Sequence, residues 1–488
     1  MKKILLFILI ILLFGLTACK KEEKQYYNDG LLLKSENKLY YSDLKSEMRL
    51  IDSNDVSPLN IRHVNNHLFY QTSFGGRVYH VNLKEKDEQA QALPSMYLYY
   101  IDNTGNLVTY INDDTIYQID LSKGLDSKEI ISNVRYYFVS SDGKKFLYRT
   151  GDEMYILDTG KKNSDPKLVL KQSVRKMYSA SDLSFIAFIT DDDDLYTYKY
   201  GKRAKLVDSN VVDIFVHDEI QKNFLYVVND DINLTAYLKA YKNGKTITIN
   251  NDYSMHAFNG IRCYYSHNKD LYYFNGSKSH LVSTNSDKVD KAIWEENLSL
   301  VYQDTNGYYN LVYKKHNYCF EDYTHTPPMY SENGKYLYLC IPGDNYVLKR
   351  IDLKSLFKKP KTIMNEPGPS GIVSVFVLGN DIFYRDTVSS RLYINGKEVG
   401  QINLVEIEEC NKKYYYLYDK HLYCINNYKI QDLQDNIDGY KVVNDKVVVF
   451  KNTSDNKEEV CVVNGNSLIT IGENVDNYYL INNYYHRW

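Results

Sequence analysis

The chain has 488 residues, a formal net charge of −3 and a hydrophobic content of 44%. A nearly balanced charge without a long basic block argues against nucleic acid as a partner. Tyrosine is unusual, with 50 residues against two tryptophans. Because a tyrosine ring packs while its hydroxyl reaches water or a polar group, this composition suits many thin sheets better than one thick core.

Residues 1–18 carry the features of an export signal. Two lysines precede an unbroken apolar run at residues 4–14, which is too short to span a bilayer. The following Leu16-Thr17-Ala18-Cys19 resembles the lipobox of bacterial lipoproteins. The resemblance implies cleavage before Cys19, a lipid on its sulfur, and anchoring to the extracytoplasmic face of the cell membrane. The alternative is an ordinary secretory peptide in which Cys19 falls there by chance.

Residues 19–30 form a tether, which includes the charged run at residues 20–24. Such a run is typical of a solvated linker. From residue 31 to the C-terminus the chain consists of variants of one repeat.

The repeat is clearest at residues 136–170. Short aromatic and aliphatic runs, such as Phe146-Leu147-Tyr148 and residues 154–157, favour half-buried strands over helices. Asp142-Gly143 lies between the first two runs and predicts a tight turn, since glycine adopts positive φ without a steric cost. Residues 158–160 and 163–166 separate the later runs, so the unit is predicted to hold four antiparallel strands.

The second run of the unit recurs along the whole body of the chain. Its occurrences are Leu31-Leu32-Leu33, residues 67–70, 107–110, Phe146-Leu147-Tyr148, 185–188, 224–226, 263–265, 300–302, 336–338, 382–384, 414–416 and 447–450. The spacing of about 38 residues is close to the period of a four-stranded β-propeller blade. Asn-Gly pairs, as at 243–244 and 275–276, fall between the runs where hairpins need them. The sequence therefore predicts an all-β protein of about twelve propeller blades.

Twelve blades exceed the usual four to eight in one ring. The first unit lacks its opening strand, and a spare strand at residues 477–481 can complete it and protect a sheet edge. We favour two six-bladed rings, residues 31–259 and 260–488, in which the strand near residues 253–258 closes the first ring and the C-terminal strand the second. Seven plus five blades, or a single large ring, are the alternatives.

No residue pattern predicts a catalytic, cofactor-binding or metal site. The acidic run Asp191-Asp192-Asp193-Asp194 could offer oxygens to calcium, but it lacks the ligand spacing of calcium loops. The pattern favours a solvated hairpin tip instead. Cys340, Cys424 and Cys461 lie in apolar runs and are expected to pack as small hydrophobes, although disulfides are possible outside the cytoplasm. The loops at 325–328 and 358–371 are expected to be surface connections.

The Asp-Gly-Lys-x-Phe/Leu-Leu-Tyr pattern of residues 142–148, with Asn-Gly-Lys in the match at 333–338, resembles lipid-anchored bacterial β-propeller proteins of the TolB-like and WD-like kind. The resemblance implies an extracytoplasmic binding or scaffold module, with the membrane as one partner through Cys19 and a protein, peptide or glycan as the other. The alternative is a hydrolase or lyase that acts on glycans with carboxylates at a channel mouth.

Overall fold

The structure is a computed structural model that describes residues 30–481, apart from the segments that follow. These are 46–47, 55–56, 73–75, 86–87, 95–99, 163, 217–218, 231–234, 252, 285, 294–297, 305, 320–328, 332–333, 342–344, 354–360, 368–372, 387–389, 402–405, 444 and 454–456. The described residues form twelve four-stranded antiparallel sheets and no helix. They divide into a smaller unit (1–93, 441–464 and 468–488) and a larger unit (94–440 and 465–467).

Three sheets lie wholly or mostly in the smaller unit. Their strands are β48 (Asn477–Leu480), β1 (Leu31–Ser35), β2 (Lys38–Ser42) and β3 (Arg49–Asp52); β4 (Leu59–Val64), β5 (His67–Gln71), β6 (Val78–Asn82) and β7 (Gln91–Ala92); β44 (Gly439–Val443), β45 (Lys446–Asn452), β46 (Glu458–Asn464) and β47 (Ser467–Val475).

Nine sheets lie in the larger unit. The first five are β8 (Tyr100–Ile101), β9 (Leu107–Asn112), β10 (Thr115–Asp120) and β11 (Ser127–Ile131); β12 (Tyr136–Val139), β13 (Lys145–Thr150), β14 (Glu153–Asp158) and β15 (Lys167–Leu170); β16 (Val174–Ser179), β17 (Phe185–Thr190), β18 (Leu195–Lys199) and β19 (Lys205–Asp208); β20 (Val211–Phe215), β21 (Phe224–Asp230), β22 (Thr235–Lys242) and β23 (Lys245–Asn251); β24 (Ser254–Asn259), β25 (Arg262–His267), β26 (Asp270–Phe274) and β27 (Ser279–Ser283). The other four are β28 (Ser286–Ile293), β29 (Ser299–Asp304), β30 (Tyr309–Tyr313) and β31 (His316–Cys319); β32 (Met329–Tyr330), β33 (Tyr336–Ile341), β34 (Asn345–Asp352) and β35 (Lys361–Pro367); β36 (Val373–Leu378), β37 (Asp381–Asp386), β38 (Arg391–Ile394) and β39 (Lys397–Gln401); β40 (Glu408–Cys410), β41 (Lys413–Tyr418), β42 (His421–Asn426) and β43 (Lys429–Gln434).

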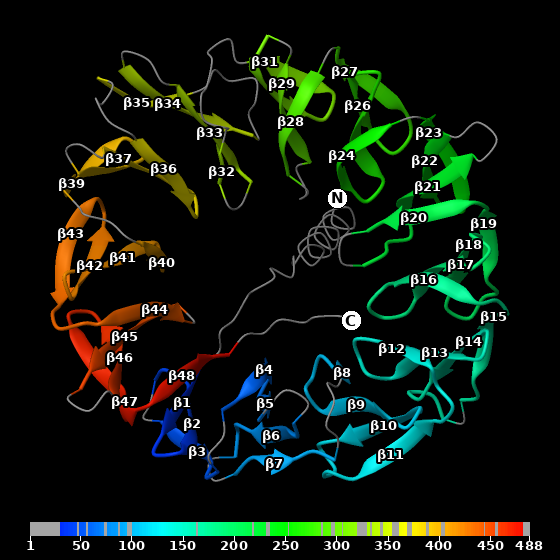
Figure 1. Ribbon diagram of the computed structural model, residues 1–488, viewed down its shortest axis with the longest axis horizontal. Helices are drawn as coiled ribbons and strands as arrows, with labels where there is room; N and C mark the ends of the chain where they lie inside the picture. The colour runs from blue at the N-terminus through cyan, green and yellow to red at the C-terminus, as the bar shows by residue number, and fades with distance from the viewer. Residues whose placement is uncertain are drawn as a thin grey trace, which may run out of the picture. The chain divides into compact units, whose positions relative to one another are not determined.

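Each sheet is one propeller blade, with its strands paired in the order first, second, third, fourth. All twelve runs predicted from the sequence become second strands, so the predicted repeat is confirmed. The predicted turns are also confirmed: Asp142-Gly143 joins β12 to β13 and Asn243-Gly244 joins β22 to β23, with positive φ at both glycines. Within the larger unit the blades follow one another along an arc, and their first strands lie on its inner side (Figure 1).

The first blade is completed by the end of the chain. Residues 31–34 of β1 pair with residues 477–480 of β48, from Leu31↔Leu480 to Lys34↔Asn477. The exchange expected near residues 253–258 is wrong, because β24 pairs with β25 within its own sheet. A boundary between residues 259 and 260 would cut that sheet, because β24 ends at Asn259 and β25 begins at Arg262. The division into two six-bladed rings stays a prediction.

Adjacent blades share hydrophobic clusters. Leu170 at the end of β15 and Phe188 in β17 belong to one cluster, which joins two blades of the larger unit. In the smaller unit, Leu39 of β2 and Tyr70 of β5 join two blades in the same way. Blades joined in this way bury faces against each other, which is why runs such as β17 are buried along their whole length.

Many tyrosines lie in stacked pairs between the second and third strands of a blade. Pairs with near-parallel rings are Tyr70–Tyr79, Tyr110–Tyr117, Tyr148–Tyr155, Tyr265–Tyr272 and Tyr416–Tyr423, with centroids 5.5, 5.3, 5.7, 5.3 and 5.0 Å apart. Such cross-strand aromatic pairs stabilise a sheet by roughly 0.2–1 kcal/mol each relative to alanine. Part of the high tyrosine content is therefore structural.

The second-strand tyrosine also bonds to the preceding blade. The Tyr70 hydroxyl donates to Asp52 Oδ2 at 2.6 Å, and both side chains are buried. The Tyr226 hydroxyl donates to Asp208 Oδ2 at 2.9 Å, where Lys239 supplies a second donor. Asp52 and Asp208 occupy the same register, opposite Leu39 and Leu195 next to a bulge. We call these contacts the blade seams.

Candidate functional site

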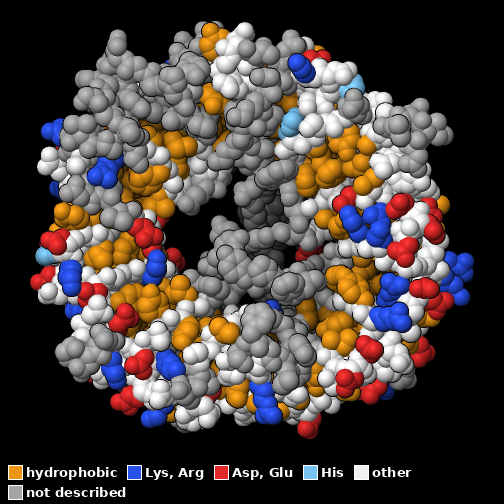
Figure 2. Space-filling view, in the orientation of Figure 1, with side chains coloured by type: hydrophobic (Ala, Val, Ile, Leu, Met, Phe, Trp, Pro, Cys, Tyr) orange, Lys and Arg blue, Asp and Glu red, His pale blue; other side chains and the backbone are white. Residues whose placement is uncertain are grey.

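The first strands of neighbouring blades in the larger unit carry partly exposed aromatic side chains. On β12, Tyr136 is 51% exposed and its ring meets Phe138 edge to face at 5.2 Å. On β20, the half-buried Phe215 packs against Phe258 of β24 with centroids 5.7 Å apart. Figure 2 shows hydrophobic side chains gathered over β12, β16 and β24. These strands line the inner side of the arc, where each presents an unpaired edge.

A charged cluster lies between β16 and β20. Lys176 Nζ donates to Asp213 Oδ2 at 2.6 Å, and the Tyr178 hydroxyl donates to the other carboxylate oxygen of Asp213. Partial burial raises the pKa of Asp213, but hydrogen bonds from Lys176 and Tyr178 outweigh this effect and hold the pKa below its usual value. The carboxylate therefore stays anionic near neutral pH. Both partners of the ion pair keep about two fifths of their side chains exposed, at 39% and 41%.

Next to Lys176 on β16, Arg175 contacts the turn between β17 and β18. Its guanidinium reaches Asp193 Oδ1 and donates to the carbonyl oxygen of Val211 at 3.2 Å. Asp193 belongs to the acidic run 191–194, which is the turn between β17 and β18. The expected hairpin tip is confirmed, and its acidic side chains make local contacts, since Asp194 Oδ1 accepts from Ser209.

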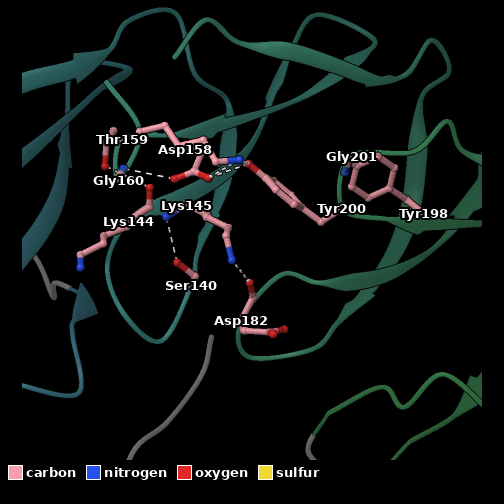
Figure 3. A network of polar contacts seen from close by, with 11 residues as sticks. Ser140, Lys144, Lys145, Asp158, Thr159, Gly160, Asp182, Tyr198, Tyr200 and Gly201 are labelled. Atoms are coloured by element: carbon pink, nitrogen blue, oxygen red, sulfur yellow. Dashed lines mark hydrogen bonds and ion pairs between the residues drawn. The ribbon is translucent and has the colours of Figure 1, made fainter. Parts of the chain in front are cut away.

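A second polar network joins the β12–β15 and β16–β19 blades at their turns (Figure 3). The Tyr200 hydroxyl donates to Asp158 Oδ2 at 2.6 Å and accepts from Lys161 Nζ at 3.1 Å. Lys161 and Lys145 both lie over the Tyr200 ring, at 4.8 and 5.1 Å from its centroid. Lys145 Nζ also donates to the carbonyl oxygen of Asp182 in the first turn of the next blade, at 3.0 Å.

The first turns of four consecutive blades are linked by hydrogen bonds. Asn103 N donates to Ser141 O at 3.0 Å, and Ser141 N donates to Ser181 O at 2.8 Å. Ser181 N in turn donates to Glu219 Oε2 at 2.9 Å. Asp142, which the sequence placed in this turn, accepts from Ser140 and Lys144 of the same turn. These links and the blade seams hold the first strands at fixed positions relative to each other.

Carboxylates of the larger unit are suited to act as charge partners. Five described carboxyl groups have a resolved pKa shift, and all five are lowered: Asp120, Glu153, Asp158, Asp182 and Asp213. A general acid in glycoside hydrolysis needs a raised pKa instead. Among the residues with described positions, no group of three metal-ligating side chains could hold a metal ion.

Several sequence-predicted features lie outside the described residues. Cys19 is one of them, as are the loop at 325–328 and residues 358–360 and 368–371 of the expected loop at 358–371. Between them the expected loop is wrong, because residues 361–367 form strand β35 and pair with β34. The backbone of Cys340 lies in β33, but its side chain is not among the described ones. Cys424 and Cys461 are buried with free thiols, as expected for small hydrophobes. Within residues 30–481 as described, no helical segment has the length and apolar character of a membrane crossing.

Sequence reasoning missed the clusters around Asp213 and Tyr200, because their members come from different blades. Lys176 and Asp213 are separated by 37 residues, and Asp158 and Tyr200 by 42. A signal was available in the repeat length itself. Polar residues about one blade period apart occupy equivalent positions in adjacent blades and are candidates for contact.

No protein-family model matches the chain, and no curated protein matches it. Solved structures match at low identity. A eukaryotic initiation factor is 10% identical, with a TM-score of 0.35 over 86% of this chain and 100% of that chain. PorZ, a surface component of the type-IX secretion system of Porphyromonas gingivalis, is 10% identical, with a TM-score of 0.26 over 82% of this chain and 64% of PorZ. The β-propeller domain of the Trilobed protease from Pyrococcus furiosus is 14% identical, with a TM-score of 0.28 over 55% of this chain and 99% of that domain.

At these values the likeness concerns the fold alone. The strand pairing assigns the chain to the β-propeller repeat proteins, with twelve four-stranded blades among the described residues. This fold fits a binding or scaffold module, because it presents turns and strand edges from many blades on rigid sheets.

Proposed function

We propose that the protein is a binding module on the extracytoplasmic face of a bacterial membrane, held there by a lipid on Cys19. The first-strand surface of the larger unit binds a protein, peptide or glycan partner. The observation that carries this proposal is the set of partly exposed aromatic rings on β12–β20 beside the Lys176–Asp213 pair. Aromatic rings supply contact area at low entropic cost, and a half-exposed ion pair supplies orientation.

The lipid anchor is tested first. Cys19→Ser should abolish incorporation of a labelled fatty acid and move the protein from the membrane fraction to the soluble fraction. Mass spectrometry of the N-terminal peptide from the wild-type protein shows whether cleavage and lipid attachment occurred at Cys19. Unchanged membrane association of Cys19→Ser, with no lipid on the wild-type peptide, would refute the anchor.

The binding surface is tested with a photoreactive amino acid at position 136, in the full chain in its own membrane. Position 418 is the matched control, since Tyr418 is 42% exposed on the same unit but lies on β41. We expect crosslinks to one partner from position 136 and none from 418, and an about tenfold or greater loss of affinity in Tyr136→Ala. Equal crosslinking at both positions would contradict the proposal. The glycan-hydrolase alternative gains no support from the lowered carboxyl pKa values.

A further inference from the structure

The two ends of the blades differ in charge. In an antiparallel blade the first and third turns lie at one end, which we call the odd-turn face, and the second turn lies at the other, the even-turn face. In the five blades from β8 to β27, every third turn holds or adjoins at least one cationic residue: Lys123, Lys161 and Lys162, Lys202 and Arg203, Lys242 and Lys245, and Lys278. Acids at the same end are fewer: Asp126 and Asp165 in third turns, and Asp102, Asp142, Asp182 and Glu219 in first turns. The second turns of the first three of these blades carry acids and no cation: Asp113 and Asp114, Asp152, and residues 191–194. In the next two blades, Asp230 ends the strand before the second turn, and Asp270 follows a second turn that holds Lys269.

Cations concentrate most at the junction of the β12–β15 and β16–β19 blades. Lys144 and Lys145 come from the first turn, residues 161–162 from the third turn, and residues 202–203 from the third turn of the next blade. Their proximity is shown by contacts. Thr159 N bonds to Lys144 O at 2.8 Å, and Lys161 reaches Tyr200, two residues before Lys202. We call these six residues the lysine cluster.

Acidic neighbours neutralise only part of the lysine cluster. Lys161 pairs with Asp158 at 3.4 Å. Asp142 accepts from its own turn, and Asp182 accepts from Ser184 N at 2.9 Å and is attracted electrostatically to Lys145. Asp165 is a further exposed acid in the same third turn as Lys162. Lys144, Lys162 and residues 202–203 are exposed and have no acidic partner among the described residues. A surplus of cationic groups therefore faces solvent at this junction.

The cationic groups also continue from blade to blade. Lys242 Nζ donates to Gly276 O at 2.8 Å and to Ser277 Oγ at 3.0 Å, so the third turns of the β20–β23 and β24–β27 blades touch. Lys161 and Tyr200 connect the third turns of the two blades at the lysine cluster in the same way. A charge that recurs once per blade along such a row fits a chain with a repeated opposite charge better than a single small anion.

We infer that the odd-turn face binds an anionic polysaccharide, with carboxylate or phosphate groups repeated along the chain and the lysine cluster as its main contact. Lysine and arginine engage such groups through charge-assisted hydrogen bonds, with counterion release adding a salt-dependent term. The inference deepens the proposed binding function by naming a ligand class, but it concerns a different surface. Tyr136→Ala therefore tests the first-strand surface and leaves this ligand class standing.

The test uses polygalacturonate as the probe and its fully methyl-esterified form as the uncharged control. The purified full chain in detergent should bind the free acid and not the ester. The triple variant Lys162→Glu, Lys202→Glu, Arg203→Glu should weaken binding at least about tenfold and reduce the salt slope by about three, as loss of three contacts predicts. The control triple Arg135→Glu, Lys171→Glu, Lys269→Glu changes the net charge equally, at exposed positions on the opposite end of the same blades, and should keep most of the affinity.

Three outcomes would overturn the inference: equal binding of acid and ester, equal loss in both triple variants, or equal affinity for polyglutamate of matched charge. The last would show attraction to any polyanion rather than to a glycan. Tighter binding to anionic phospholipid vesicles than to polygalacturonate, lost in the cluster triple alone, would assign the surface to the membrane instead. Unchanged thermal unfolding of both triples verifies that neither substitution disturbs the fold.

Discussion

The blade seam at Asp52 and Tyr70 yields a quantitative prediction. Tyr70→Phe removes only the hydroxyl that donates to Asp52 Oδ2 at 2.6 Å. Asp52 keeps the two donors from Asn54, at 2.9 and 2.8 Å, but both reach Oδ1. Oδ2 would lose its donor while 97% of Asp52 is shielded from solvent. Removing a donor from a buried charged group costs about 1.5–3 kcal/mol, so we expect the free energy of unfolding to fall by that amount.

A natural apolar seam supplies the control. In the β12–β19 region the corresponding positions are Leu170 and Phe188, which pack in one cluster without a hydrogen bond between them. Asp52→Leu combined with Tyr70→Phe copies this pair into the smaller unit. Replacing both partners by apolar groups leaves no unsatisfied atom, so the double variant should be more stable than Tyr70→Phe alone.

The assay is chemical denaturation of wild type, both single variants and the double variant, followed by tyrosine fluorescence and circular dichroism. The double-mutant cycle should give a coupling energy of about 1 kcal/mol or more, with the double variant less destabilised than the sum of the singles. Strictly additive effects, or a Tyr70→Phe variant within about 0.5 kcal/mol of wild type, would refute the seam as a source of stability.

Three further predictions concern stability. Burial, with a smaller contribution from His67, lowers the pKa of His80 to about 3, below its unfolded value, so the unfolded chain binds the proton first. The free energy of unfolding should be greatest above about pH 6.5 and fall by about 1.4 kcal/mol per pH unit toward pH 3. Denaturation at several pH values should show a flatter slope for His80→Gln. An unchanged slope would contradict the assignment to His80. Gly143 and Gly151 both have positive φ, 68° and 60°, so alanine at either position should cost about 1–2 kcal/mol in the same assay. A Cβ at Gly143 would also lie 3.1–3.2 Å from Leu107 and Asp102, whereas Gly151 has open space, so Gly143→Ala should cost more than Gly151→Ala; equal costs would contradict the effect of this contact. Deleting residues 477–488 should make residues 31–42 sensitive to protease, and a synthetic peptide of residues 476–482 should restore protection; resistance without the peptide would show that β48 is dispensable.

The strand repeat could be predicted from the sequence because it depends on local pattern. Triplets such as Phe146-Leu147-Tyr148 mark the second strand, and Asp142-Gly143 permits the turn that precedes it. The contacts between blades could not be predicted in this way, since they depend on which positions face each other across a seam. The sequence nevertheless contains one sign of the blade seams: Asp52 precedes Tyr70, and Asp208 precedes Tyr226, by the same 18 residues.

The different charges at the two ends of the blades could not be predicted from the sequence either. Lysines and aspartates alternate along the sequence, so the net charge of −3 gives no sign of two different faces. Only the antiparallel order of the strands separates Lys161 and Lys202 from Asp152 and residues 191–194. The strand exchange expected near residues 253–258 was wrong for a related reason: an edge strand is compatible with several partners, and hydrophobic pattern does not choose among them.

The pairing of β1 with β48 has a consequence for biogenesis. The strand that is synthesised first in the folded body pairs with one of the last, across more than four hundred residues. The first blade thus stays incomplete until residues 477–480 have been synthesised, and the long loop closed by this contact makes its formation slow. A prematurely terminated chain would lack the same strand and expose the edge of β1, which would distinguish it from the finished protein.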